Sequence, residues 1–471
     1  MRRRSSAWAS FDCHRARFSG QHWYCKERAL ALGRFADYFP PEDYLSLYSF
    51  MDEKPKVRPV EAFPVQQDGK TLIYLKDPLN FAPPIGLSPM GYFLLAHLDG
   101  RHTFVDIQAA YNQNFGGLLM SEDIKAFVGM LDQHYYLESK RFSDYQQAVI
   151  AEFRRKPHRA PAHAGGGYQS EPLPLMAQID DYFLAPKGPG FPADEVVRTT
   201  TAETPRAIVA PHIDFHRGGP AYAWAYRPLL ESDGADLYVI LGTSHCGGRT
   251  PYILTRKGFE TPLGLVETDD EFVTRLQENC AEDCFTDEYL HRGEHSVEFQ
   301  VLFLKYAAHK RAALSGQPEK PFKIVPILVS SFHELMMRRT PPEQTEPVGK
   351  FLRALRQMVE RDSRRICFVA GVDLAHVGKQ FGDSEPITDQ FLKWVEAEDR
   401  ELVDHLTLLD APGFFSHIAK DQDRRKICGF SPLYSLIHLL DGVRGNALHY
   451  GQAFTAETGS AVTFTSVVFN Y

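Results

Sequence analysis

The stretch AIVAPHIDFHRGG, residues 207–219, contains the arrangement that decides the fold of the larger part of this chain. Its apolar start, Ala207–Ala210, predicts a short buried strand, which Pro211 ends because proline cannot donate to a sheet ladder. Residues 218–220 then predict the start of a helix, with the proline in the first helical position. His212 lies directly after the strand, where open parallel sheets bind their ligands. It is therefore a candidate site residue, although a histidine at the end of a strand is more often a structural, hydrogen-bonded residue.

The same order of strand, turn and chemically active side chain recurs along the chain. Apolar strands predicted at 236–241 and 365–370 are followed by histidine or aspartate, and the turn at 426–432 places a cysteine before a helix predicted at 433–440. Histidine, cysteine and carboxylate groups are the side chains that bind transition metals. The candidates in these turns are His212, His245, Asp373, His376 and Cys428. Their recurrence favours one functional site over several unrelated structural residues.

Length and composition limit the class of protein. A chain of 471 residues suggests two or three domains, and 44% apolar with 24% charged residues is typical of a globular protein. The net charge of -8 gives no electrostatic footprint for nucleic acid, and no apolar run reaches the roughly 18 residues of a membrane span. We therefore expect a cytoplasmic protein that binds neither nucleic acid nor a membrane.

The seven cysteines are scattered along the chain, which fits a reducing compartment rather than a disulfide framework. Cys280 and Cys284 are four residues apart in a predicted helix, which leaves two interpretations: half of a metal site, or two separate thiols. The second is favoured because no further pair of cysteines has a matching spacing.

The sequence before the turns that carry the candidate ligands predicts an N-terminal extension and a small separate domain. Residues 1–55 form the extension, whose arginine- and serine-rich start lacks the apolar segment of a secretory signal; a transit peptide stays an alternative. Residues 56–154 form the domain, beginning with a hairpin turned at Asp68-Gly69. Helices are then predicted to start at the following residues: Ser88, Thr103 and Ser121. A hairpin with three amphipathic helices favours a winged-helix-like α+β fold.

The small domain also resembles a known family. Its order of elements and the phrase LLAHLDGRHTFVDI, residues 94–107, resemble the PqqD-like peptide-recognition domains found beside radical-SAM peptide-modifying enzymes. A DNA-binding winged helix is one rival, but the third helix begins with the acids Glu122 and Asp123 rather than with basic residues. The other rival is a helical cap that only packs on the larger domain.

Residues 155–172 predict a linker, because they combine basic residues with three glycines, end in proline and lack apolar periodicity. From 173 to 471 strands alternate with helices, which predicts an α/β fold with a mostly parallel central sheet and helices on both faces. The strand predicted at 323–329 contains Pro326, which argues for an edge or a bulge. A last strand at 461–469 is expected in or beside the same sheet.

Six motifs occur in a fixed order within 173–471: PHIDFHRGGPAYAWAY, LGTSHCG, GEHSVEFQVLFL, KIVPILV, VDLAHVG and CGFSPL. In the third motif, residues 294–300 precede an apolar helix predicted at 301–306. Together the motifs resemble the Memo family, which implies an extradiol dioxygenase-like fold with a metal pocket at the carboxyl edge of the sheet. The resemblance also implies site residues: metal ligands at His212, His245 and Cys428, and catalytic groups at Asp373, His376 and His295.

Two departures from the family pattern concern the surroundings of the site rather than its ligands. Cys246 stands where the family often has a second histidine, and Gly371 and Val372 stand where it often has serines before the aspartate. Neither change removes a ligand that the resemblance implies. Both alter the polarity expected around a substrate.

The implied ligands indicate the kind of metal. Two neutral imidazoles and one thiolate would leave open positions on a metal, as a catalytic or redox site requires. The thiolate favours softer ions such as Cu(I), Zn(II) or Fe(II), and the resemblance favours Fe(II), with copper or zinc as alternatives. His376 and His295 could transfer protons, or could support the ligands through hydrogen bonds. Asp373 could act with them or bind the metal itself.

Two classes of function stay open. One is a metal-dependent, dioxygenase-like oxidoreductase acting on a small or peptide-borne aromatic or phenolic substrate. The other is a non-catalytic protein that binds or delivers a metal, or that binds an extended peptide without a metal. Some Memo-like bacterial proteins accompany a radical-SAM enzyme and an AMMECR-type protein in the AmmeMemoRadiSam system. The resemblance therefore implies these partners, or a peptide substrate held by the small domain.

Overall fold

The computed structural model describes residues 54–67, 69–199 and 203–470. The chain divides into two compact units: Met1–Asp144 with Ala456–Thr458, and Tyr145–Thr455 with Gly459–Tyr471. The predicted extension 1–55 therefore lies almost entirely outside the described residues, as does Asp68 of the predicted hairpin turn.

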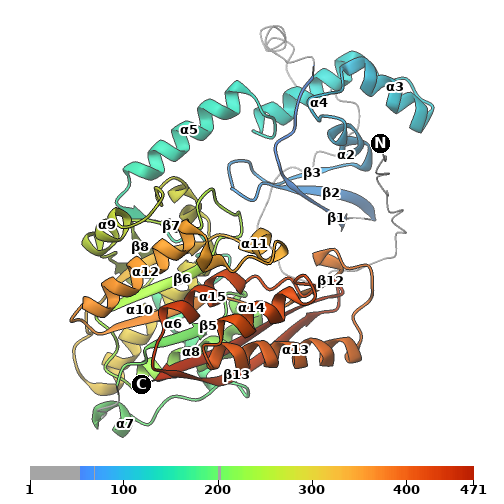
Figure 1. Cartoon of the computed structure of the whole chain (residues 1–471). Helices are drawn as coiled ribbons and strands as arrows, with labels where there is room; N and C mark the ends of the chain where they lie inside the picture. The colour runs from blue at the N-terminus through green and yellow to red at the C-terminus, as the bar shows by residue number, and fades with distance from the viewer. Residues whose placement is uncertain (1–53, 68, 200–202, 471) are drawn as a thin grey trace. The chain divides into compact units, whose positions relative to one another are not determined.

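The first unit contains the hairpin and the three helices that the sequence predicts (Figure 1). Its antiparallel sheet has the order β1-β2-β3, and its elements are β1 (Glu61–Gln67), β2 (Lys70–Lys76), β3 (Ile85–Leu87), α2 (Pro89–Ala96), α3 (Phe104–Phe115) and α4 (Ser121–Gln133). The side chains of Ser88 and Thr103 accept backbone N–H groups in the first turns of α2 and α3, as predicted. At α4 the cap differs, because Ser121 is the first helical residue and Asp123 accepts the N–H of Met120. The winged-helix arrangement of these elements stays a prediction.

The second unit is built on an eight-stranded mixed sheet (Figure 1). Its order is β12-β14-β5-β11-β6-β10-β7, with β13 paired to β14; the strands are β5 (Ala207–Ala210), β6 (Leu237–Thr243), β7 (Tyr252–Leu254), β10 (Lys323–Val329), β11 (Ile366–Gly371), β12 (His376–Gly378), β13 (Arg444–Thr455) and β14 (Ser460–Asn470). The central strands β5, β11, β6 and β10 are parallel, whereas the outer pairings are antiparallel. The α/β class is thus confirmed, but the expectation of a mostly parallel sheet is right only at the centre. No helix separates β13 from β14, so the second strand returns antiparallel beside the first.

Helices flank both faces of this sheet because its central strands are buried and apolar at almost every position. Successive side chains of a strand point to opposite faces. In β5, Ala207 and Val209 pack into a core shared with α9, α12, α13, α14 and α15, whereas Ile208 and Ala210 pack into a second core with α6, α8 and α10. The helices of this unit are α6 (Pro172–Leu184), α7 (Asp194–Thr199), α8 (Phe215–Leu230), α9 (Asp270–Glu278), α10 (His295–Ser315), α11 (His333–Met337), α12 (Glu346–Arg361), α13 (Asp389–Thr407), α14 (Ala411–Ala419) and α15 (Phe430–Leu439).

None of the described helices is both long enough and apolar enough to span a bilayer.

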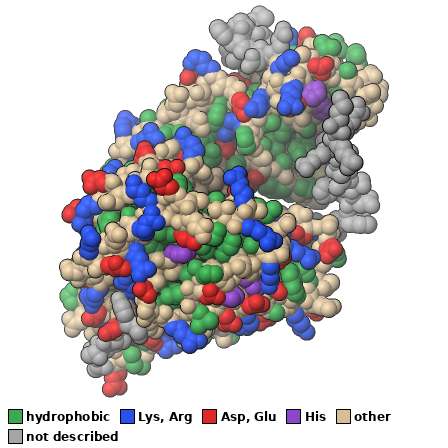
Figure 2. All heavy atoms as spheres, viewed as in Figure 1, with side chains coloured by type: hydrophobic (Ala, Val, Ile, Leu, Met, Phe, Trp, Pro, Cys, Tyr) green, Lys and Arg blue, Asp and Glu red, His purple; other side chains and the backbone are tan. Residues whose placement is uncertain are grey.

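On the face drawn in Figure 2, acidic and basic side chains are interspersed over the second unit. That face therefore does not concentrate charge of one sign.

Helix α8 begins earlier than the sequence predicts. Its cap is Asp214, whose carboxylate accepts a backbone N–H of the first turn. Pro220 consequently lies inside the helix rather than at its first position. The glycines before it serve packing, since a Cβ on Gly219 would collide with the ring of Tyr182 on α6. A close helix–helix approach, and not a helix start, is the reason for glycine here.

Helix α10 begins at His295 rather than at residue 301. The sequence obscures this start because Glu298 and Gln300 are polar, although both are buried in the structure. Each has a partner in the interior: Glu298 pairs with Arg159, and Gln300 donates to the carbonyl of Pro211 at 2.9 Å. Burial of a polar side chain is tolerated where such a partner exists.

Strand β10 accommodates Pro326 at a local edge. The neighbouring strand β7 pairs only with Ile327–Val329, so β10 has one partner strand at Pro326. Proline is tolerated at such positions. The strand predicted at 461–469 is β14 and belongs to the main sheet, as expected.

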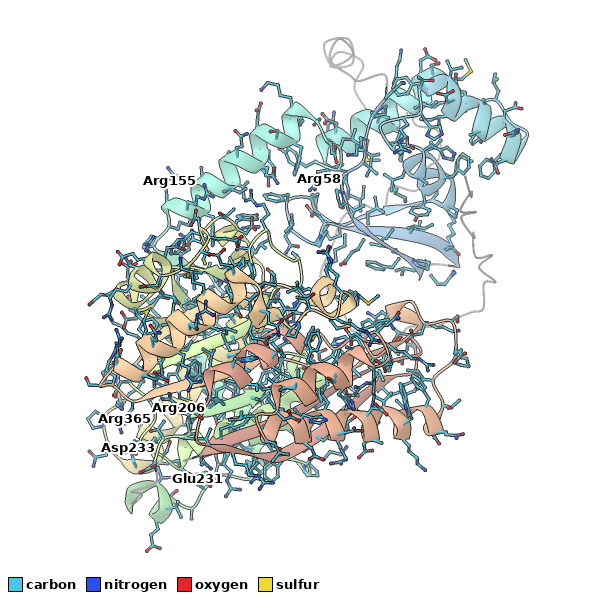
Figure 3. The ribbon with its side chains drawn as sticks, in the orientation of Figure 1. Arg58, Arg155, Arg206, Glu231, Asp233 and Arg365 are labelled. Atoms are coloured by element: carbon cyan, nitrogen blue, oxygen red, sulfur yellow. The ribbon has the colours of Figure 1, made fainter. Side chains whose placement is uncertain are left out.

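Residues 155–172 differ from the predicted linker. Helix α5 (Lys140–Arg155) ends at Arg155, labelled in Figure 3, and β4 (His158–Arg159) joins β8 (Gly258–Thr261) and β9 (Gly264–Val266) in a separate sheet. Arg159 is buried and lies 2.6 Å from the Glu298 carboxylate. Glu298 also accepts the hydroxyl of Tyr168 and the backbone N–H of His163. The segment is therefore fixed to α10 by a buried ion pair that its basic composition did not reveal.

We predict that Arg159→Ala costs about 3–5 kcal/mol of stability, because it leaves the Glu298 carboxylate buried without its cation. Burial pushes the pKa of Glu298 upward, but Arg159, together with His163 and Tyr168, outweighs it and keeps that pKa below its ordinary value. Without Arg159 the pKa rises, so the loss should be larger at pH 8, where Glu298 must ionise, than at pH 4, where it can stay protonated. Urea denaturation at both pH values measures this.

The matched control is Arg400→Ala, because Arg400 and Glu396 form an ion pair that is 61% and 40% exposed. That change should cost at most about 1 kcal/mol. Equal losses for the two variants would contradict the structural role of Arg159.

Candidate metal centre

The predicted site residues lie in turns at one edge of the main sheet. His212 follows β5, His245 follows β6 and Asp373 follows β11, and these strands are parallel neighbours. Their carboxyl ends therefore meet at the same edge. At the amino end of β11 lies a different kind of contact, in which Arg365 pairs with Asp233 at 3.4 Å (Figure 3).

The amino end of α10 reaches the carboxyl edge because two strand glycines leave room for it. A Cβ on Gly371 would lie 2.5 Å from the carbonyl oxygen of Ser296, and a Cβ on Gly242 would lie 2.6 Å from Ser296 Oγ. Ser296 Oγ donates to the carbonyl of Thr243 at 2.8 Å, which fixes the helix to the end of β6. This close approach places His295, the first residue of α10, beside the strand-end residues.

His212 is buried, and a backbone hydrogen bond fixes its ring. Nδ1 lies 3.0 Å from the carbonyl of Gly371, which can only accept, so Nδ1 donates and Nε2 carries the lone pair. Nε2 faces Cys428 Sγ at 3.2 Å. Burial, followed by the nearby His245, holds the pKa of His212 well below its ordinary value. His212 is thus a neutral imidazole whose free nitrogen faces a thiol.

His245 is oriented by Glu294, a residue that the sequence analysis passes over. Its Nδ1 lies 3.0 Å from Glu294 Oε1, and its backbone N–H donates to Oε2 at 3.0 Å. Burial by itself would raise the pKa of Glu294, but His245 and His295 outweigh it and hold that pKa well below its ordinary value. An ionised carboxylate behind one ring nitrogen fixes the orientation of the ring and makes the other nitrogen a better metal ligand.

The sequence did contain a signal for Glu294. The residue directly precedes an apolar helix, and in the structure it is the N-cap of α10, accepting the N–H of Ser296 at 3.0 Å. Because the helix was predicted to begin at 301, an acid at 294 was not recognised as a cap. A correct helix start would have placed Glu294 next to the site.

Cys428 reaches the two histidines from the turn before α15. That turn lies close to the turn after β11 because Gly429 has no side chain; a Cβ there would lie 2.5 Å from the carbonyl oxygen of Asp373. Burial, and then the charge of Asp373, raise the pKa of the Cys428 thiol well above its ordinary value. One donor atom from each of His212, His245 and Cys428 lies within 4.8 Å of the other two. The structure therefore brings the three predicted ligands together.

Asp373 lies beside this group, buried and held by two backbone hydrogen bonds. Oδ1 accepts the backbone N–H groups of His212 at 3.0 Å and Ile213 at 3.1 Å, and Oδ2 lies 3.6 Å from His212 Nε2. Burial raises the pKa of Asp373 to about 6. A carboxyl group with this pKa can exchange a proton near neutral pH.

The two remaining candidates also lie at this edge. The rings of His295 and His245 stack with centroids 4.7 Å apart, and His295 Nδ1 lies 3.2 Å from Glu294 Oε1. His376 bonds through Nδ1 to a backbone carbonyl at 3.1 Å and lies within electrostatic reach of Asp373 and His245. Burial is the main cause that lowers the pKa of both His295 and His376. Both rings are therefore neutral at neutral pH and able to accept a proton.

Cys280 and Cys284 do not lie in a helix, because α9 ends at Glu278 and both follow it. Within the described ranges, no group of three or more metal-binding side chains includes either cysteine.

The chain also resembles known proteins over most of its length. The profile of the Memo-like protein family matches residues 159–468. This chain belongs to the Memo-like family. A MEMO1 family protein of Aquifex aeolicus is 28% identical over 419 residues, which covers 88% of this chain and all of that protein. Two other MEMO1 family proteins, from Sulfolobus acidocaldarius and Methanopyrus kandleri, are 31% and 29% identical and cover 60% and 66% of this chain, or 87% and 98% of their own lengths.

The match confirms the family that the six motifs predict for this Memo-like chain. The matched range begins at 159, within the segment predicted as a linker, which agrees with the burial of Arg159 against α10. The likeness to the Aquifex protein extends beyond this range into the first unit. The PqqD-like assignment of the first unit stays a prediction.

We predict that Gly371→Ala destabilises the second unit by about 1–3 kcal/mol, the usual cost of overpacking. The added Cβ would meet the backbone of α10 2.5 Å away, and backbone cannot rotate aside as a side chain can. A matched control is Gly129→Ala in α4, where a Cβ meets nothing within 4 Å and alanine should be neutral or stabilising. Chemical denaturation of both variants measures the difference. Unchanged stability of Gly371→Ala would contradict the close approach described here.

Proposed function

We propose that this Memo-like protein is a metal-dependent oxidoreductase, with one divalent metal held by His212, His245 and Cys428. The observation that carries the proposal is that each histidine has its second ring nitrogen already bonded, to the Gly371 carbonyl behind His212 and to Glu294 behind His245. Metal-binding histidines need such partners, which fix the ring and its tautomer. The proposed substrate is a small or peptide-borne aromatic or phenolic compound, and a kinship in fold with extradiol dioxygenases belongs to the same proposal.

The donor set fits a metal of soft or borderline character. Nitrogen and sulfur ligands at about 2.1 and 2.3 Å from a tetrahedral metal lie roughly 3.6 Å apart. His212 Nε2 and Cys428 Sγ are 3.2 Å apart, so a small outward shift admits a metal between them. A bound cation would also deprotonate the Cys428 thiol, which burial and the charge of Asp373 keep protonated. Fe(II) is the proposed metal, and Cu and Zn are the alternatives that the same donors accept.

Around the metal, the residues of this chain would handle protons. The metal would supply Lewis-acid or redox chemistry at the positions that three protein ligands leave open. Asp373, with a pKa of about 6, can hold or release a proton at Oδ2. His376 and His295 are neutral, so either can accept the proton of a phenolic hydroxyl bound beside them.

Metal handling is the second candidate function, and the exposure of His245 favours it. The side chain of His245 is 36% exposed, whereas that of His212 is 2% exposed. An accessible ligand can be exchanged for a ligand of another protein, as delivery of an ion requires. In this function the first unit would recruit a peptide or partner, with a radical-SAM enzyme and an AMMECR-type protein as the proposed partners.

We expect that replacing any of the three ligands with alanine lowers the metal content of the anaerobically purified protein steeply, because only two protein donors remain. Elemental analysis of the three single variants measures this. Cys246→Ala is the matched control, since Cys246 is an exposed cysteine that directly follows one of the ligands. Full metal content in all three ligand variants would rule out this site.

His376→Gln separates the two candidate functions. A pocket that only stores an ion should show a modest change in metal affinity, at most the roughly 10–100-fold typical of losing a supporting group. A catalytic pocket should lose about 10²–10⁴-fold in rate with the metal still bound. Oxygen uptake by the Fe(II)-loaded protein, tested with catechols and phenolic peptides, gives the rate. Absence of uptake with every compound, together with tight reversible metal binding, would favour metal handling.

A further inference from the structure

We propose that a second metal site lies between α13 and α14, where Glu401, His405 and His417 bind Zn(II) or a similar divalent transition metal. One donor atom from each of these residues lies within 4.8 Å of the other two. The site uses different residues on different elements from the centre at the sheet edge. A result that excludes this second site would therefore leave the function proposed above unaffected.

The sequence positions of the ligands suit a shared metal. Glu401 and His405 are four residues apart on α13 and so lie on the same face of that helix. His417 lies on α14, which packs against α13, and its ring centroid is 5.9 Å from that of His405. Two histidines and one carboxylate form a ligand set that zinc uses in proteins, with a further position left open.

His405 is oriented in the way that metal-binding histidines are. Its Nδ1 lies 2.8 Å from Asp410 Oδ2, which leaves Nε2 free. Asp410 is itself fixed as the N-cap of α14, since Oδ1 accepts the N–H of Gly413 at 3.0 Å. Glycine at 413 leaves room for this pair, because a Cβ there would meet the His405 ring and the Asp410 carboxylate. The chain therefore fixes the ring of a partly exposed histidine, for which packing of the core gives no reason.

His417 supplies an independent observation. It is only 4% exposed, yet its Nε2 makes no hydrogen bond within the part of the chain that the structure describes. Nδ1 lies 3.4 Å from Glu401 Oε1, and Nε2 lies 3.3 Å from Glu398 Oε2. Burial, followed by the positive charges of Arg425 and Lys420, lowers the pKa of His417, so its ring is neutral and available as a ligand. Nδ1, the nitrogen beside Glu401, is therefore the atom that would bind the metal, while the Glu398 carboxylate lies behind Nε2 as metal-binding histidines require.

The ammonium group of Lys420 occupies a place in this group that suits a cation. Its ammonium lies 2.6 Å from Glu398 Oε2 and 3.3 Å from His417 Nδ1. The lysine side chain is 43% exposed and can move away, leaving Glu398 behind. Metal and ammonium would therefore compete for the same place. Glu401 Oε1 already lies 3.4 Å from His417 Nδ1, roughly the separation of two ligands on a tetrahedral zinc, and its side chain, 59% exposed, can adjust toward the His405 ring.

The test measures zinc binding by the full-length chain without the first site. In a Cys428→Ser, His245→Gln background, we expect one Zn(II) per chain by isothermal titration calorimetry. Adding Glu401→Gln or His405→Gln should weaken this binding at least 100-fold, because one ligand of three is lost. Adding Glu396→Gln, an exposed carboxylate on the same helix that lies outside the group, should change nothing. Lys420→Met should tighten binding about tenfold by removing a competing charge.

Binding of zinc that persists unchanged in both Glu401→Gln and His405→Gln would overturn the proposal, as would a background variant that binds no zinc. Should the background fail to fold, the same substitutions in the otherwise unchanged chain decide the question. There, Glu401→Gln should remove one equivalent of bound zinc while Glu396→Gln removes none. Equal zinc content in these two variants would contradict the second site.

Discussion

The close contact between the first turn of α10 and the ends of two parallel strands determines the geometry of the candidate centre. It exists because Gly242 and Gly371 present no side chain to Ser296. Once the helix lies there, its N-cap Glu294 falls behind His245, and His295 stacks on the same ring. A single packing constraint thus positions one carboxylate and two imidazoles at once. The same constraint requires glycine at 371, because there is no room there for a Cβ.

Buried charges hold the turns around the centre. Arg425 pairs with Asp399 in the interior, and the same carboxylate accepts the hydroxyl of Thr463. Thr463 Oγ1 in turn accepts the N–H of Ala375 at 2.8 Å. The carbonyl of Arg425 accepts the N–H of His376 at 2.7 Å, which ties the turn after β11 to the turn that carries the cysteine. This polar network therefore sets the position of His376 relative to the other site residues.

Much of this arrangement could be predicted from the sequence, and each prediction that was wrong has a specific physical reason. Apolar strands that end in turns with histidine, aspartate or cysteine predicted which residues would meet, because the carboxyl ends of parallel strands share one edge. Helix starts were placed too late at α8 and α10, since Pro220 and the polar pair Glu298 and Gln300 hide helices whose interiors they occupy. A partner far away in the chain satisfies both Glu298 and Gln300, and such pairing leaves no periodic pattern. For the same reason, the pairing of Arg159 with Glu298 could not be inferred from a segment whose composition is that of a linker.

X-ray absorption spectroscopy of the anaerobic, Fe(II)-loaded, full-length protein tests the central claim most directly, because it counts the atoms bound to the metal and distinguishes sulfur from nitrogen. The account predicts one sulfur at about 2.3 Å together with two imidazole nitrogens, and further light-atom ligands at the open positions. A metal surrounded only by nitrogen and oxygen would contradict the account, because the turn at Cys428 would then not contribute to the centre.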